Sequence, residues 1–148
     1  MRKTFQMIFV LTFVGLISGA ALAFIYRYAN PLIIENQKNE TEQAIFKIFP
    51  DGKSYNTKTV KGEDLFTVKD KDNASLGYAF LAEGYGYQGT ISIMAGIKLD
   101  LETLVGIEIL ESQETPGLGQ EITQDKFKSQ FKGLKTSPEI TYTKDKKS

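Results

Sequence analysis

The sequence predicts an α+β protein in which an N-terminal transmembrane helix and a helical stem precede a small domain built on an antiparallel sheet. Three observations support this class: a long apolar run without charges, a charged stretch with partly helical spacing, and several short aliphatic or aromatic runs bounded by turn residues. The 148 residues suffice for one modest domain with an appendage. We expect the boundaries at 1–29 for the anchor, 30–50 for the stem and 51–148 for the domain.

The anchor is predicted from the apolar run at residues 5–26, which is long enough to cross a hydrocarbon layer of about 30 Å as a helix. The alternative is a cleaved signal peptide ending near Ala21-Leu22-Ala23, but the run exceeds the usual length of about 7–15 residues. Arg2 and Lys3 precede the span, so the positive-inside rule predicts a single-pass protein of the inner or plasma membrane. Its N-terminus would be cytoplasmic, its soluble domain extracytoplasmic, and its helix in contact with membrane lipid.

The stem is followed by a domain made mostly of strands. Pro50-Asp51-Gly52 is a turn signal that ends the stem. Short runs rich in aliphatic, aromatic and β-branched residues then predict strands at 64–68, 76–83, 90–97, 104–110 and 140–143. Residues 123–133 predict a short amphipathic helix, with Thr123 as a cap, Phe127 and Phe131 on one face, and Gly133 at the end.

The composition excludes several classes of chemistry. The chain has no cysteine and no histidine, which removes disulfides, thiolate nucleophiles, Ser-His-Asp catalysis and the usual zinc and haem ligands. The formal net charge is zero, so no overall basic field attracts nucleic acid. Any redox chemistry must therefore come from an organic cofactor. A hydrolase is a poor interpretation, because no nucleophile and base can be paired.

The stretch EGYGYQGT at residues 83–90 contains a G-x-G-x-x-G pattern. A dinucleotide-binding fingerprint requires a helix after its glycines, whereas TISIMAGI, at 90–97, is typical of a strand. We therefore interpret Gly84, Gly86 and Gly89 as hairpin residues that permit positive φ. Tyr85 and Tyr87 would decorate this turn and could border a flat aromatic ligand.

The segment ETPGLG is the most unusual local sequence. Read blandly, it is a rigid turn between a strand and a helix. The residue before proline favours extended conformations, and the glycines allow the backbone to approach another group closely. Such a loop could instead hold a planar heterocycle, since ligand sites combine apolar walls with a few placed polar groups. The candidate cofactor-binding residues are Glu114, Thr115, Pro116, Gly117, Leu118 and Gly119.

These features together resemble the RnfG/NqrC family, the FMN-binding subunits of Rnf electron-transport complexes and of sodium-pumping quinone reductases. The resemblance rests on the N-terminal span, on GYGYQGTISIMAGI, on GIEILESQETPGLGQEI and on a phenylalanine-containing helix ending in FKG. It implies a small antiparallel-sheet FMN-binding domain. It also implies an electron-transfer subunit, without a complete active site of its own, that works with the other subunits of a membrane-bound, ion-translocating oxidoreductase of Rnf type (ferredoxin:NAD oxidoreductase).

In that family FMN is held covalently by a threonine in an S-G-A-T motif near the C-terminus, and this motif is absent from the chain. We expect either a fragment or a member that has lost covalent attachment, and favour the fragment. The alternatives for function are an assembly or scaffold subunit without flavin, an NqrC-type subunit, and an anchored module for another extracytoplasmic ligand.

Overall fold

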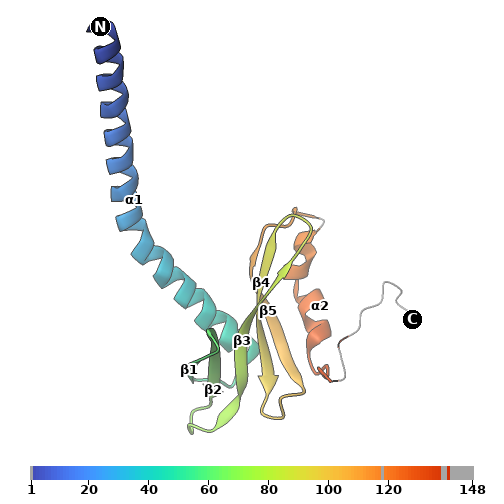
Figure 1. The fold of residues 1–148 in the computed structure, drawn as a ribbon. Coiled ribbons are helices and arrows are strands. Elements are labelled where there is room, and N and C mark those ends of the chain that lie inside the picture. The colour runs from blue at the N-terminus through green and yellow to red at the C-terminus, as the bar shows by residue number, and fades with distance from the viewer. Residues whose placement is uncertain (1, 118, 138–139, 141–148) are drawn as a thin grey trace. The chain divides into compact units, whose positions relative to one another are not determined.

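The computed structural model describes residues 2–117, 119–137 and 140 (Figure 1). The chain divides into two compact units, residues 1–39 and 40–148, which are treated separately below. The first unit is wholly helical in its described part, whereas the second contains an antiparallel sheet with short helices. The predicted α+β class is therefore confirmed.

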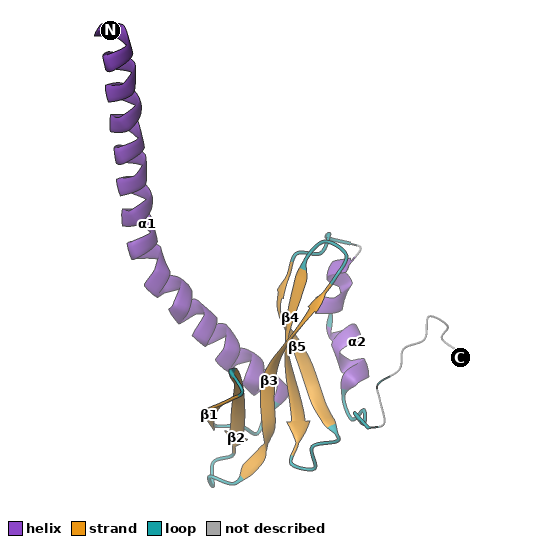
Figure 2. Cartoon of the chain, viewed as in Figure 1, coloured by secondary structure: helices purple, strands orange, loops and turns teal. Residues whose placement is uncertain are grey.

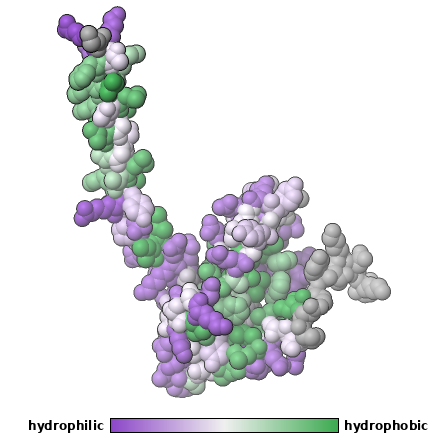
Figure 3. Space-filling model, in the orientation of Figure 1, coloured by the Kyte–Doolittle hydropathy of each residue, from purple (hydrophilic) through white to green (hydrophobic). Residues whose placement is uncertain are grey.

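One helix, α1 (Arg2–Ile48), runs through the first unit and into the second. It contains a stretch that is long and apolar enough to cross a membrane. Figure 3 shows hydrophobic residues covering the N-terminal part of α1, with hydrophilic residues at the chain end. The helix continues through Pro31, which has no backbone N–H and so leaves one intrahelical hydrogen bond unmade.

The second unit is built on a five-stranded antiparallel sheet in which each strand pairs with its neighbour in sequence (Figure 2). The strands are β1 (Ser54–Val60), β2 (Glu63–Lys69), β3 (Ser75–Tyr85), β4 (Thr90–Lys98) and β5 (Leu104–Ser112). Four of these contain the strands predicted at 64–68, 76–83, 90–97 and 104–110. The run predicted at 140–143 lies outside the described residues except for Ile140, which is not in a strand.

The sheet contains one strand, β1, that the sequence did not predict. Its side chains are almost all exposed, so it has no alternation of apolar and polar residues from which a strand could be inferred. The available signal was the turn after it. Lys61 and Gly62 have φ values of 55° and 92°, as a tight hairpin turn between β1 and β2 requires.

The hydrophobic core lies between the end of α1 and one face of the sheet. Its helix side is formed by Ala44, Ile45, Ile48 and Phe49, and its sheet side by Phe66, Val68, Ala79 and Met94. The last turns of the predicted stem therefore belong to the globular unit. Burying a large aliphatic or aromatic side chain stabilises a fold by about 1.5–3 kcal/mol, so this contact fixes the helix end on the sheet.

Close packing of the helix end requires a glycine on β4. A Cβ atom at Gly96 would overlap Ile48 and lie 2.8 Å from Cε2 of Phe49. Gly106 is the residue paired with Gly96 on β5, yet a Cβ there would be 4.0 Å from Ile48, an ordinary contact. The absence of a side chain at Gly96 thus lets α1 approach the sheet.

The amphipathic helix predicted at 123–133 is a series of short turns: η1 (Gly119–Thr123), α2 (Asp125–Lys128) and η2 (Ser129–Phe131). Thr123 does not cap a helix, because its hydroxyl donates to the Gln120 carbonyl and Gln124 occupies the cap position. The predicted pairing of Phe127 with Phe131 is correct, with ring centroids 5.4 Å apart. Helices this short have few internal hydrogen bonds and depend on contacts with the sheet.

Candidate functional site

The β3–β4 turn and the loop after β5 lie at the same end of the sheet. Tyr85 pairs with Thr90 at the end of the hairpin, and Ile91 pairs with Ser112, the last residue of β5. The Gly86 amide closes the turn by donating to the Gly89 carbonyl at 2.8 Å. Because β4 borders both β3 and β5, the sheet brings the glycine-rich turn and the ETPGLG segment together (Figure 2).

Glu114 is the residue that joins the two segments. Its Oε1 accepts a hydrogen bond from the Gln88 amide at 3.0 Å, across 26 positions of sequence. Its own amide donates to Oγ of Ser112 at 3.3 Å, which holds the loop to the end of β5. The side chain is half-buried. The carboxylate therefore lies over the hairpin turn and does not extend freely into solvent.

The glycines of this region serve mainly to make room, and the expectation of positive φ at Gly84, Gly86 and Gly89 is wrong. A Cβ at Gly86 would overlap Oε1 of Glu114. A Cβ at Gly89 would lie 2.7 Å from Oε1 of Gln113. Neighbouring side chains of the loop thus occupy the space above two glycines of the turn. A sequence pattern cannot distinguish this use of glycine from a need for left-handed backbone.

The remaining predicted site residues form the exposed part of the loop. Thr115 is half-buried, and its carbonyl accepts the Gln120 amide at 3.2 Å. Pro116 and Gly117 are exposed, and Gly117 has a φ of 76° with open space where a Cβ would be. A Cβ at Gly119 would lie 2.5 Å from Oε2 of Glu114. Leu118 lies outside the described residues.

Two aromatic rings stand beside this loop. Tyr85 and Tyr87 are 95% and 93% exposed, which is unusual for such large side chains in a folded domain. The hairpin that carries them is the one fixed by Glu114. This end of the sheet therefore combines exposed aromatic surface, a glycine with open space in front of it, and a nearby carboxylate and hydroxyl.

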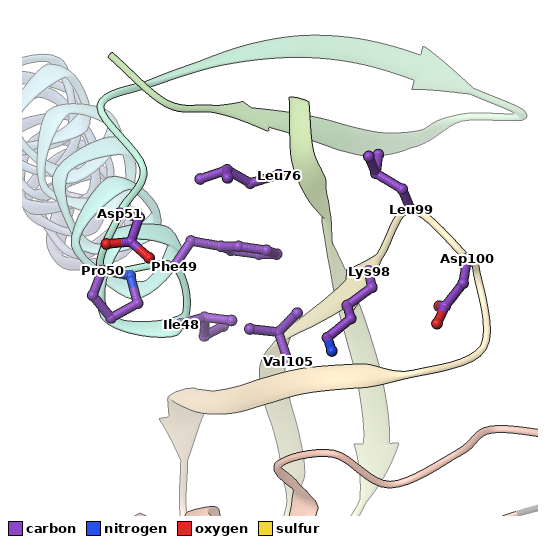
Figure 4. A pocket seen from close by; sticks show the side chains of 9 residues that line it. All are labelled: Ile48, Phe49, Pro50, Asp51, Leu76, Lys98, Leu99, Asp100 and Val105. Atoms are coloured by element: carbon purple, nitrogen blue, oxygen red, sulfur yellow. The ribbon is translucent and has the colours of Figure 1, made fainter. Parts of the chain in front are cut away.

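A separate cavity of about 430 Å³ lies next to the end of α1 and the β4–β5 turn (Figure 4). Its lining residues are Ile48, Phe49, Pro50, Asp51, Leu76, Lys98, Leu99, Asp100 and Val105. The lining is mainly apolar. Both oxygens of Asp100 already accept hydrogen bonds within the β4–β5 turn, from the Glu102 and Thr103 amides and the Thr103 hydroxyl. This cavity therefore offers little for the polar edge of a cofactor.

Charged groups outside the loop form structural ion pairs. Glu108 on β5 contacts Lys47 at 3.2 Å and Lys128 at 2.9 Å, and Asp125 contacts Lys128 at 3.0 Å. Within residues 2–117, 119–137 and 140, no group of three or more acidic side chains is placed to hold a metal ion. The predicted site at residues 114–119 is thus the best candidate for an organic ligand.

The comparisons with known proteins agree with this choice. The FMN-binding domain family matches residues 86–147, a range that starts at the hairpin turn and includes the ETPGLG segment. The G-type subunit of the proton-translocating ferredoxin:NAD(+) oxidoreductase complex of Clostridium ljungdahlii is 29% identical over 136 residues, or 92% of this chain and 71% of the relative. The chain belongs to the RnfG/NqrC family. Its predicted FMN cofactor is thereby confirmed.

Other members of the RnfG/NqrC family match to different extents. The G-type subunit of the ion-translocating oxidoreductase complex of Methanosarcina acetivorans is 26% identical over 90% of this chain and 75% of its own length. The C-type subunit of the Na(+)-translocating NADH-quinone reductase of Chlamydia pneumoniae is 34% identical, but over only 53% of this chain and 24% of its own length. These two G-type relatives therefore match nearly the whole chain, whereas the C-type match is partial.

Proposed function

We propose that this chain is the FMN-carrying electron-transfer subunit of an ion-translocating oxidoreductase complex of Rnf type. The observation that carries the proposal is the similarity to G-type subunits over about nine-tenths of the chain, together with the FMN-binding domain match that begins at the hairpin. Its partners would be the other subunits of the complex. The apolar part of α1 and the complexes to which the relatives belong indicate association with a membrane.

We propose further that FMN lies against the segment from Glu114 to Gly119. The residues present fit the cofactor, because open space faces Gly117 and the exposed rings of Tyr85 and Tyr87 can contact a flat heterocycle. When bound, FMN supplies the electron chemistry, and the protein binds and orients it. Thr115 would offer a hydroxyl at the polar edge, and Gly117 would let the backbone approach the ring.

The membrane topology follows from the charges at the two ends of the span. Arg2 and Lys3 precede the apolar stretch of α1, and Arg27 follows it. The excess of positive charge at the N-terminus supports a cytoplasmic N-terminus and an extracytoplasmic domain. Cysteine substitutions at Lys3 and Lys53, tested with a thiol reagent that cannot cross the membrane, would check this. Labelling at position 3 of intact cells, without labelling at position 53, would contradict the topology.

The function is tested by purifying the native complex through an affinity tag on this chain. We expect other membrane subunits to co-purify and the preparation to show flavin absorbance and FMN in stoichiometric amount. Co-purification without FMN would favour a scaffold subunit, and a chain that purifies alone and colourless would contradict both interpretations. Recovery with quinone-reductase subunits in place of ferredoxin-oxidising ones would identify the C type.

A further inference from the structure

The contacts of Glu114 suggest a more specific role than ring contact. We propose that Glu114 is a positioning residue: its carboxylate fixes the 86–89 turn against the 113–119 loop and thereby shapes the FMN site, without touching FMN. This inference rests on the proposed function. It differs from a direct role because the group on which Glu114 acts is the Gln88 amide, to which its Oε1 is hydrogen-bonded at 3.0 Å.

The geometry around the carboxylate supports a latch. Oε1 lies over Gly86 and Oε2 lies over Gly119, so closely that a Cβ at either position would overlap Glu114 or come within 2.5 Å of it. Both glycines therefore leave room for the same side chain, one on each segment. At its other end, the Glu114 amide is tied to Ser112 at the end of β5. The side chain thus spans from one fixed strand end to the neighbouring turn.

The latch has a direct consequence for the aromatic side chains. Tyr85 precedes the turn and Tyr87 lies within it, and both are almost fully exposed. Few packing contacts hold them, so their position depends on the backbone of the turn. An acceptor that fixes the Gln88 amide restricts this backbone before the ligand arrives. Restricting a site in advance reduces the entropy lost on binding.

Length and charge separate a latch from an electrostatic contact. Glu114→Gln keeps the length and one oxygen acceptor but loses the charge, whereas Glu114→Asp keeps the charge but loses the reach by one methylene. The latch predicts that Gln retains function and Asp does not. A direct electrostatic role toward the cofactor predicts the reverse. Glu111→Ala is a matched control, because Glu111 is an exposed carboxylate three residues earlier on β5.

Two measurements on the full chain in detergent or nanodiscs test the proposal. The first is hydrogen exchange at the Gln88 amide, which should be about tenfold faster or more in Glu114→Asp and Glu114→Ala, since a hydrogen bond to a charged group is worth at least that factor. The second is titration with free FMN, followed by flavin fluorescence. The apparent Kd should rise by a similar factor in the same two variants and stay near wild type in Glu114→Gln and Glu111→Ala.

The outcomes separate this inference from the function on which it rests. If the wild-type chain binds FMN and all variants bind it equally well, the inference is wrong and the function stands. A variant series in which Asp matches wild type and Gln does not also overturns it. If wild type binds no FMN, the proposed function and the inference fail together. Exchange at the Met94 amide, in the core, shows whether each variant is folded, and the Gln and Asp pair decides the matter if Ala is not.

Discussion

Lys128 Nζ lies 2.9 Å from Oε2 of Glu108, and both side chains are only 14% exposed. Glu108 also accepts a hydrogen bond from Lys47 at 3.2 Å. One carboxylate on β5 therefore holds the end of α1 on one side and α2 on the other. Because α2 has a single turn, this pair does more to place it than its own helical hydrogen bonds can.

We expect Glu108→Ala to lower the free energy of unfolding by about 1–3 kcal/mol, since removing one partner leaves a largely shielded ammonium without its main acceptor. Glu111→Ala, on the exposed face of the same strand, should change it by no more than about 0.5 kcal/mol. Urea denaturation followed by tyrosine fluorescence measures both. Equal effects of the two substitutions would show that the pair contributes nothing specific.

The contribution of Lys128 should disappear only at high pH. Burial alone lowers the pKa of Lys128, but hydrogen bonds to Glu108 and Asp125 outweigh it and raise the pKa above its ordinary value of 10.5. A raised folded-state pKa stabilises the fold fully below the unfolded pKa, and this stabilisation is lost as pH rises through the folded pKa. The stability difference between wild type and Lys128→Met should therefore be constant around neutral pH and shrink above about pH 10.5. A decrease already near neutral pH contradicts this assignment.

The β4–β5 turn should loosen in acid. The amides of Glu102 and Thr103, and then the Thr103 hydroxyl, hold the pKa of Asp100 down to about 2, from 3.8. A depressed pKa adds stability above the unfolded value, and this is lost as pH falls through the folded one. Exchange of the Glu102 and Thr103 amides should thus remain slow at pH 4 and accelerate toward about pH 2. Asp100→Asn should show no such step, and a wild-type Asp100 carboxyl that titrates near 4 by NMR would refute the assignment.

The packing of α1 on the sheet should tolerate a methyl group at one glycine and not at its neighbour. Gly96→Ala places a Cβ against Ile48 and Phe49, so we expect a loss of about 1–3 kcal/mol from overpacking. Gly106→Ala, paired with Gly96 on β5, meets Ile48 only at 4.0 Å and should cost much less. Chemical denaturation of the two variants compares them directly. A larger loss at Gly106 would mean that the helix end lies elsewhere.

A methyl group at Gly119 should disturb the cofactor site from a distance. Its Cβ would meet three atoms of the Glu114 side chain within 3.0 Å, so Gly119→Ala must displace that side chain. We expect faster exchange at the Gln88 amide and weaker binding of free FMN. Gly84→Ala is the control, because a Cβ there meets nothing within 4 Å. Unchanged exchange at Gln88 in Gly119→Ala would contradict the described position of Glu114.

Much of the fold could be predicted because its determinants are local. Four strands carry apolar or aromatic residues that face the core, such as Val68, Ala79 and Met94, and each run ends at turn residues. The strand β1 lacks this pattern because it lies at the sheet edge with its side chains in water. The helix at 123–133 was expected from local spacing, but contacts with β5 reduced it to short turns.

The sequence by itself determined the apolar span, the order of the inner strands, and the ETPGLG and glycine-rich segments that mark the FMN-binding family. Only the tertiary structure showed that Glu114 reaches the Gln88 amide, and that Gly86 and Gly119 make room for it. The physical reason is distance along the chain. Propensity and periodicity act over a few residues, whereas a hydrogen bond across 26 positions exists only after the sheet has placed its strand ends side by side.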